Sequence, residues 1–163
     1  MKSNVINAAE GGAENNKGEM TKQWLFHGTS EDTGELQLVQ SCRCECHLTV
    51  QCAVPKIVSQ GFNRAFAGKN AVVYGRGVYF ARDSSYSAST TYSSPDGRGI
   101  QRMFLCRVAV GDYCYGQNGQ LVPDSKTGDG LNLYDSTVDD TDDPSIFVCY
   151  HDAQAYPDCE VQS

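Results

Sequence analysis

The chain has 163 residues, of which 40% are hydrophobic and 20% are charged, a composition typical of one globular domain with its own core. The formal net charge of −7 argues against direct binding to nucleic acid or to an anionic membrane, because both attract clustered Lys and Arg. The sequence contains no run of about eighteen apolar residues, so no membrane span is predicted. Residues 1–20 also lack the apolar centre of a signal peptide. We therefore expect an intracellular protein, in the nucleus or the cytoplasm, whose cysteines are mostly reduced thiols.

The predicted elements begin after a polar N-terminal stretch. Residues 1–20 are rich in Asn, Glu and Gly, so we expect a disordered segment or linker there, followed by one domain over residues 21–163. The short aromatic run Trp24–His27 indicates a buried strand with a turn at Gly28. Residues 34–51 form a Cys-rich insert within the domain.

Helix and strand signals alternate in the middle of the chain. Residues 55–60 predict a short helix, with Gly61 as its C-terminal cap. Residues 75–81 are typical of a glycine-containing turn that enters a strand. Residues 83–85 offer an N-cap for a helix over Tyr86–Tyr92.

The C-terminal half predicts mostly strands and loops. Residues 102–110 are the clearest strand, and Tyr113–Tyr115 are expected to extend it beyond a bulge. Residues 116–144 are rich in Gly, Asp and Asn and predict mainly loop. Residues 146–150 predict another strand, and residues 155–161 an edge strand because they contain a proline. The sum is an α+β domain built around an antiparallel β-sheet with short helices.

The sequence His27-Gly28-Thr29 is the first candidate for chemistry. Glycine lets a planar group approach the backbone, whose N–H and C=O can then pair with a primary amide. The preceding His27 can donate to or accept from a ribose hydroxyl. The structural alternative is a hydrogen-bonded histidine at a strand end, followed by a turn glycine.

A second candidate block runs from Gly75 to Tyr92. The phenol rings of Tyr79 and Tyr92 can enclose a flat heteroaromatic ring, and Ser87 can offer a hydroxyl to an amide oxygen. The alternative is that both tyrosines are core residues, since the chain has nine tyrosines.

Taken in order, these motifs resemble the catalytic domain of the poly(ADP-ribose) polymerase (PARP)-like ADP-ribosyltransferase family. The match is closest to the mono-transferase subclass that is often linked to macrodomains. The resemblance rests on Leu25-Phe26-His27-Gly28-Thr29, Gly61-Phe62-Asn63-Arg64, Gly75 to Ala81, Ser85 to Ala88, Thr91-Tyr92-Ser93, Pro144 to Val148 and Gln154-Ala155-Tyr156-Pro157. It implies the α+β ADP-ribosyltransferase fold, with part of the N-terminal strand and helix missing. The chain is therefore expected to be a truncated domain or a partial gene product.

The resemblance also implies roles for individual residues in binding NAD⁺ as co-substrate, without a metal. Gly28 would hold the nicotinamide carboxamide through its backbone, with Ser87 completing the clamp. Tyr92 would stack on the nicotinamide, Tyr79 would lie on its other side, and His27 would bind the adenosine ribose. Residues 63–70 would form a loop over the donor site.

The catalytic triad implied by the resemblance is His27, Tyr79 and Ile146, where the polymerising branch has a glutamate in third place. Isoleucine can neither accept a proton nor orient a hydroxyl, so chain elongation should fail. Transfer to a protein Glu or Asp can survive, because an ionised carboxylate is itself the nucleophile. We therefore expect mono-ADP-ribosylation of a protein acceptor, including the chain itself, with release of nicotinamide. The chain would act as a monomer or as part of a longer protein.

Two other hypotheses remain open. The chain could hold NAD⁺ or ADP-ribose without turnover. The insert at residues 34–51 is absent from the family pattern and could be translated intron. Alternatively, it could form a zinc-stabilised interaction domain. Its candidate ligands are Cys42, Cys44, Cys46, His47 and Cys52, although they contain no C-x₂-C pair. The acidic residues Asp135, Asp139, Asp140, Asp142 and Asp143 lack the spacing of a calcium loop and are expected to be a solvated loop.

Overall fold

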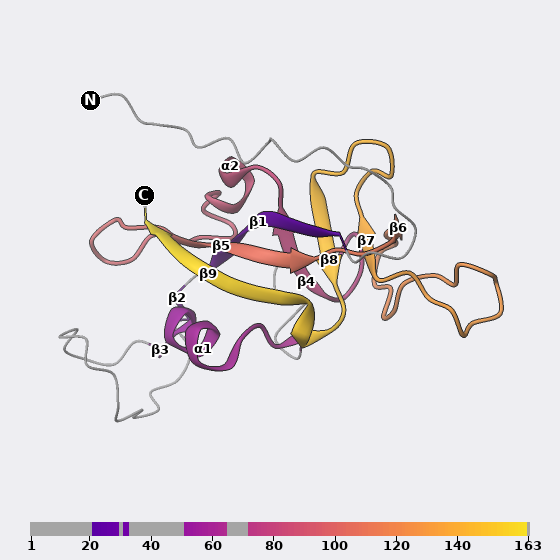
Figure 1. Ribbon diagram of the computed structural model, residues 1–163. Helices are drawn as coiled ribbons and strands as arrows, with labels where there is room; N and C mark the ends of the chain where they lie inside the picture. Colours follow the sequence, from indigo (N-terminus) through magenta and orange to yellow (C-terminus); the bar gives the residue numbers. More distant parts are fainter. Residues whose placement is uncertain (1–20, 30, 33–50, 65–71, 163) are drawn as a thin grey trace.

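The computed structural model describes residues 21–29, 31–32, 51–64 and 72–162. Seven strands form one sheet in the order β6-β7-β8-β4-β1-β5-β9 (Figure 1). Their bounds are β1 Lys22–Thr29, β4 Val78–Ala81, β5 Arg102–Ala109, β6 Tyr113–Tyr115, β7 Ser136–Val138, β8 Ile146–Cys149 and β9 Ala155–Gln162. Every neighbouring pair is antiparallel except β6 and β7. The short strands β2 (Glu31–Asp32) and β3 (Gln51–Cys52) pair separately. The predicted α+β class with an antiparallel sheet is confirmed.

The sheet consists of two halves that meet between β1 and β4. In the long half, all eight residues of β1 pair with β5, and β5 pairs in turn with β9. In the short half, β4 pairs with β8 from Val78↔Cys149 to Ala81↔Ile146. One residue pair, Phe26↔Ala81, connects β1 to β4. Figure 1 shows β5 and β9 crossing the direction of β4 and β8, as expected when a twisted sheet is joined at a narrow point.

The core lies where the two halves pack together. Burial alternates along β5, so that Phe104, Cys106 and Val108 point inward. All residues of β7 and β8 are buried, including Phe147. Phe62 joins them from the segment after the first helix.

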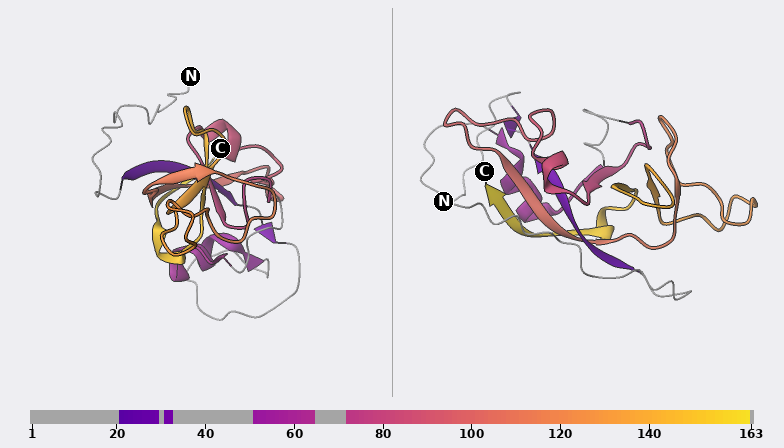
Figure 2. Two further views of the ribbon diagram at one scale, coloured as in Figure 1. Left: turned by 90° about the vertical axis from the view of Figure 1, so that its right-hand side faces the viewer. Right: turned by 90° about the horizontal axis from the view of Figure 1, so that it is seen from above.

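The predicted helix before Gly61 is confirmed and begins two residues earlier. Helix α1 spans Ala53–Gln60, and Ile57 packs against the core. Gly61 has a φ of 74°, and its N–H donates to the Ile57 carbonyl at 2.9 Å, which ends the helix as a left-handed cap. Figure 2 shows α1 on the opposite side of the sheet from α2.

The predicted helix over Tyr86–Tyr92 is wrong in its extent. Helix α2 spans only Ser84–Ser87, and the chain then continues through turns to Tyr92. The Asp83 side chain makes no cap hydrogen bond. The residues after Ser87 are mostly Ser and Thr, which lower helix propensity by competing for backbone hydrogen bonds or by restricting χ1.

Three strand predictions also need correction. Strand β1 does not turn at Gly28 but continues to Thr29, because Gly28 pairs with Met103 of β5. Strand β6 does not extend β5: Gly111, with a φ of 63°, redirects the chain, and β6 lies at the opposite edge of the sheet. The predicted loop over residues 116–144 contains the buried strand β7.

The strands predicted at residues 102–110, 146–150 and 155–161 are confirmed as β5, β8 and β9. Pro157 lies on the edge strand, next to a register shift between Leu105 and Cys106 of β5. Among the described residues, no helix is long and apolar enough to cross a membrane. The predicted linker at residues 1–20 lies outside the described residues, as does nearly all of the insert, including four of its five candidate zinc ligands.

Candidate active site

Gly28 is the point at which β1 meets the segment after α2. A Cβ placed on Gly28 would collide with the backbone carbonyl oxygen of Ser87 and would lie 3.0 Å from the Cβ of Tyr92. Both residues therefore approach the Gly28 backbone more closely than any side chain would allow. Ser87 is buried, with 3% of its surface exposed. Gly28 and Ser87, predicted to hold the carboxamide, and Tyr92, predicted to stack on the nicotinamide, therefore lie next to one another.

His27 connects the two halves of the sheet next to Gly28. Its Nδ1 lies 2.8 Å from the backbone carbonyl oxygen of Tyr79, so Nδ1 carries the proton and donates to that oxygen. Its ring also packs edge-on against Phe62 and tilted against Phe80, with centroid distances of 4.9 and 5.5 Å. Burial lowers the pKa of His27 and outweighs the opposing effect of the hydrogen bond to Tyr79. Nε2 of the neutral ring is therefore an acceptor.

Tyr79, on β4, uses its hydroxyl to hold the preceding turn. The hydroxyl accepts a hydrogen bond from the Tyr74 N–H at 3.0 Å and donates to the Gly75 carbonyl at 2.9 Å. Burial raises the pKa of Tyr79 to about 12, and the phenols of Tyr150, Tyr74 and Tyr92 add to that increase. Tyr79 therefore stays neutral, and Tyr92 lies close enough to influence it.

Tyr92 packs against a residue that the sequence did not single out. The rings of Tyr86 and Tyr92 are stacked, with centroids 4.9 Å apart and an interplanar angle of 22°. Their hydroxyls are 2.8 Å apart and form a hydrogen bond. Burial is the main cause of the raised pKa of Tyr86, and the hydrogen bond to Tyr92 is the second cause. No pattern in the sequence indicated this role, because a tyrosine on a short helix has no distinctive spacing.

Tyr92 and Ile146 line one cleft of about 430 Å³. Its other lining residues are Asp83, Ser85, Tyr86, Ser89 and Ser145. The cleft is not lined by His27, Gly28, Tyr79 or Ser87. Tyr92 is therefore the residue that the cleft shares with the close contact at Gly28. Within the cleft the predicted third position of the triad is apolar, because Ile146 offers only hydrocarbon.

Asp139 fixes the start of β8 beside this cleft. Its carboxylate accepts hydrogen bonds from the N–H groups of Ser145 at 2.9 Å and Ile146 at 2.8 Å, and from the Ser145 hydroxyl. Partial burial alone would raise the pKa of Asp139, but the hydrogen bonds from Ser145 and Ile146 outweigh it and lower the pKa. Asp139 therefore has a structural role, whereas Asp140, Asp142 and Asp143 are exposed as predicted. Among the described residues, no group of three His, Cys, Asp or Glu side chains is arranged to hold a metal.

The predicted site residues are thus linked in a chain of contacts. Gly28 touches Ser87 and Tyr92, His27 is hydrogen-bonded to Tyr79, and Tyr92 shares a cleft with Ile146. Their roles in binding and catalysis stay predictions. Most of the predicted loop at residues 63–70 lies outside the described residues. Only residues 63 and 64 of this loop are described. The backbone N–H of Arg64 donates a hydrogen bond to the Asp152 carboxylate at 2.9 Å.

Comparisons with known proteins identify this arrangement. Residues 47–159 match the family model of the poly(ADP-ribose) polymerase catalytic domain. The chain is 41% identical over 140 residues to the human protein mono-ADP-ribosyltransferase PARP14, an alignment that covers 85% of this chain and 7% of that protein. It is 40% identical over 127 residues to mouse protein mono-ADP-ribosyltransferase PARP10, covering 74% of this chain and 13% of the relative.

A solved structure shows the same fold. The PARP domain of Arabidopsis RADICAL-INDUCED CELL DEATH1 superposes with a TM-score of 0.64 at 19% identity, over 90% of this chain and 69% of that one. The family predicted from the sequence is confirmed. The chain belongs to the poly(ADP-ribose) polymerase catalytic domain family.

Proposed function

We propose that this chain transfers single ADP-ribose units from NAD⁺ to Glu or Asp side chains of a protein, including its own, and releases nicotinamide. The observation that carries this proposal is the convergence of Ser87 and Tyr92 on the bare backbone of Gly28. The relatives named as protein mono-ADP-ribosyltransferases support the reaction type.

The Gly28 contact suits the nicotinamide end of NAD⁺. A planar carboxamide needs one donor and one acceptor at close range, which a glycine backbone offers without a side chain in the way. The Ser87 hydroxyl can add a hydrogen bond, and the Tyr92 ring can stack on the pyridine for roughly 0.5–1.5 kcal/mol. The ring of Tyr92 is held by its stacking on Tyr86, so its orientation is already fixed before binding.

His27 suits a ribose hydroxyl. Its Nδ1 proton is engaged with Tyr79, and its lowered pKa keeps the ring neutral near pH 7. Nε2 can therefore accept a hydrogen bond from a ribose hydroxyl. Because the tautomer is fixed, Nε2 is an oriented hydrogen-bond acceptor on a neutral ring.

Ile146 supports a single transfer. A growing chain needs a base for the incoming ribose hydroxyl, whereas a carboxylate acceptor arrives ionised at neutral pH. Ile146 is buried and apolar in the cleft beside Tyr92. The acceptor would therefore supply the nucleophile, while the chain supplies orientation and exclusion of water.

Intact mass measurement after incubation with NAD⁺ tests the proposal. We expect single ADP-ribose additions, time-dependent nicotinamide release and no polymer ladder with labelled NAD⁺. Mild hydroxylamine should remove the adducts, because it cleaves esters of Glu and Asp. Tyr92→Ala should slow nicotinamide release, whereas Tyr156→Ala, at a tyrosine that is 61% exposed on β9, should not.

Each alternative outcome has a distinct meaning. Polymer ladders would overturn the single transfer, and hydroxylamine-resistant adducts would overturn the carboxylate acceptor. Binding of NAD⁺ without nicotinamide release would identify a binding module in place of an enzyme.

A further inference from the structure

The segment that carries Tyr92 has little regular structure of its own. Helix α2 ends at Ser87, five residues before Tyr92. Within the segment, the Ser89 carbonyl accepts hydrogen bonds from the N–H groups of Tyr92 at 2.9 Å and Ser93 at 2.8 Å. These bonds shape the turn, but they do not connect it to the sheet.

Gln101 makes that connection. Its Nε2 donates to the Ala88 carbonyl at 2.8 Å and to the Ser93 carbonyl at 2.7 Å. The two acceptors lie at either end of the turn that contains Tyr92. A single side-chain amide, with two donors at a fixed angle, therefore spans the turn and fixes its width.

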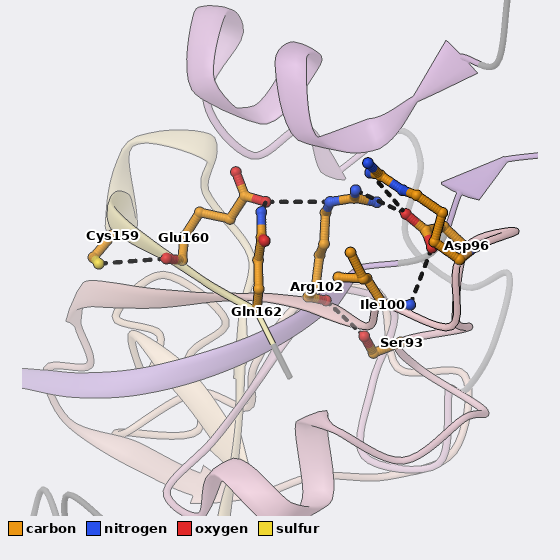
Figure 3. A network of polar contacts seen from close by, with 8 residues as sticks. Ser93, Asp96, Ile100, Arg102, Cys159, Glu160 and Gln162 are labelled. Atoms are coloured by element: carbon orange, nitrogen blue, oxygen red, sulfur yellow. Dashed lines mark hydrogen bonds and ion pairs between the residues drawn. The ribbon is translucent and has the colours of Figure 1, made fainter. Parts of the chain in front are cut away.

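The residues around Gln101 are themselves held in place, as Figure 3 shows. The fully buried Ser93 donates its hydroxyl proton to the Arg102 carbonyl at 2.6 Å. Asp96 accepts from the Ile100 N–H at 3.0 Å and pairs with the Arg102 guanidinium at 2.9 Å. The Ile100 N–H is the main cause of the lowered pKa of Asp96, about 2. Arg102 also pairs with Glu160 of β9 at 3.3 Å.

The residues at the start of β5 therefore contact both Gly28 and the turn that carries Tyr92. Arg102 and Met103 pair with Thr29 and Gly28 of β1, while the preceding residue, Gln101, holds the turn that carries Tyr92. We infer that Gln101 is a positioning residue whose amide sets the spacing between Tyr92 and Gly28, and so the affinity for nicotinamide. This inference rests on the proposed function of the same site.

Binding measurements with two probes test the role of Gln101. In the proposed function nicotinamide occupies only the Gly28 end of the site, whereas ADP-ribose lacks the nicotinamide group. Gln101→Met keeps the side-chain length but removes both donors. We expect its nicotinamide affinity, measured by calorimetry, to fall roughly tenfold, in line with two lost hydrogen bonds. Its affinity for ADP-ribose should stay within about twofold, and KM for NAD⁺ should rise more than kcat falls.

Gln154→Met is the matched control. The Gln154 amide also bridges two backbone carbonyls, those of Ala109 and Asp135, but it lies outside the cleft and the Gly28 contact. Its variant should lose stability while keeping the wild-type ratio of nicotinamide to ADP-ribose affinity. If Gln101→Met fails to fold, Gln101→Asn retains an amide that is one carbon shorter, and we expect a smaller loss of nicotinamide affinity.

The outcomes separate this inference from the proposed function. Wild-type nicotinamide affinity in the Gln101 variants, or equal loss of both ligands, would overturn the positioning role while leaving the function intact. A wild-type chain that binds neither nicotinamide nor NAD⁺ would overturn the proposed function, and the role of Gln101 with it.

Discussion

The two halves of the sheet are stabilised in different ways. The long half, β1, β5 and β9, consists of eight-residue strands in extended ladders, and β9 keeps mostly exposed or half-buried side chains. The short half consists of strands of three or four residues, and every residue of β7 and β8 is buried. The long half therefore combines extended ladders with one face in the core, whereas β7 and β8 are short strands that are buried throughout.

This difference bears on the position of the candidate site. A long ladder gives Gly28 a fixed backbone position, and a buried short strand gives Ile146 a fixed apolar surface. The halves share one residue pair between β1 and β4, and His27 links them beside that pair through its hydrogen bond to the Tyr79 carbonyl. We therefore expect changes at the junction to alter the site more than changes within either half.

The largest expected effect comes from Gly28→Ala at the junction. The added methyl would collide with the Ser87 carbonyl, so the clamp would have to open. We expect NAD⁺ affinity to fall by roughly a hundredfold and stability by about 1–3 kcal/mol. Gly97→Ala is the matched control, because a Cβ there meets nothing within 4 Å. Calorimetry and thermal unfolding measure both effects. Equal NAD⁺ affinity in the two variants would contradict a site at this contact.

A smaller, pH-dependent effect is expected from His27, which links the halves through Tyr79. Its pKa is lowered on folding, so the unfolded chain binds the proton first as the pH falls below 6.5. The contribution of His27 to stability is therefore complete above pH 6.5 and is lost as the pH falls toward its lower folded pKa. Urea unfolding from pH 5 to 8 measures this slope. His27→Gln should flatten it, and an unchanged slope would show that other groups cause it.

The smallest effect is expected from Arg82→Ala, outside the junction contacts. Arg82 follows β4, and its guanidinium pairs with Asp143 at 2.6 Å, but both side chains are largely exposed. Exposed ion pairs contribute about 0–1 kcal/mol, so stability should change little and the change should vanish in high salt. NAD⁺ affinity should stay within about twofold. A tenfold loss would mean that this end of β4 contacts the ligand.

The long half was easier to predict from the sequence than the short half. Continuous or alternating apolar residues mark β5 over Arg102–Ala109. Strand β7 was missed because it has only three residues and acidic residues flank it. Its Ser136 and Thr137 are fully buried, where hydrogen bonds to the Val110 and Tyr74 carbonyls satisfy their hydroxyls. Such partners are distant in sequence and leave no local pattern.

The candidate site divides in the same way. The short motifs around His27, Tyr79 and Tyr92 made these residues visible in the sequence. Gly28 was expected to form a turn, because a glycine after an apolar run indicates one, yet a close contact with Ser87 explains it. Tyr86 lies within one motif of the resemblance but was given no role, and Gln101 gave no signal, since its acceptors are backbone carbonyls of Ala88 and Ser93 that only the folded turn presents.

The two outer strands also bear on self-association. At one end of the sheet, Pro157 has no N–H to offer, and the register shift beside it interrupts the regular spacing of β9. At the other end, β6 exposes only the three residues Tyr113–Tyr115. Both borders are poor templates for a strand from a second copy, so concentrated solutions should resist fibril growth along these edges.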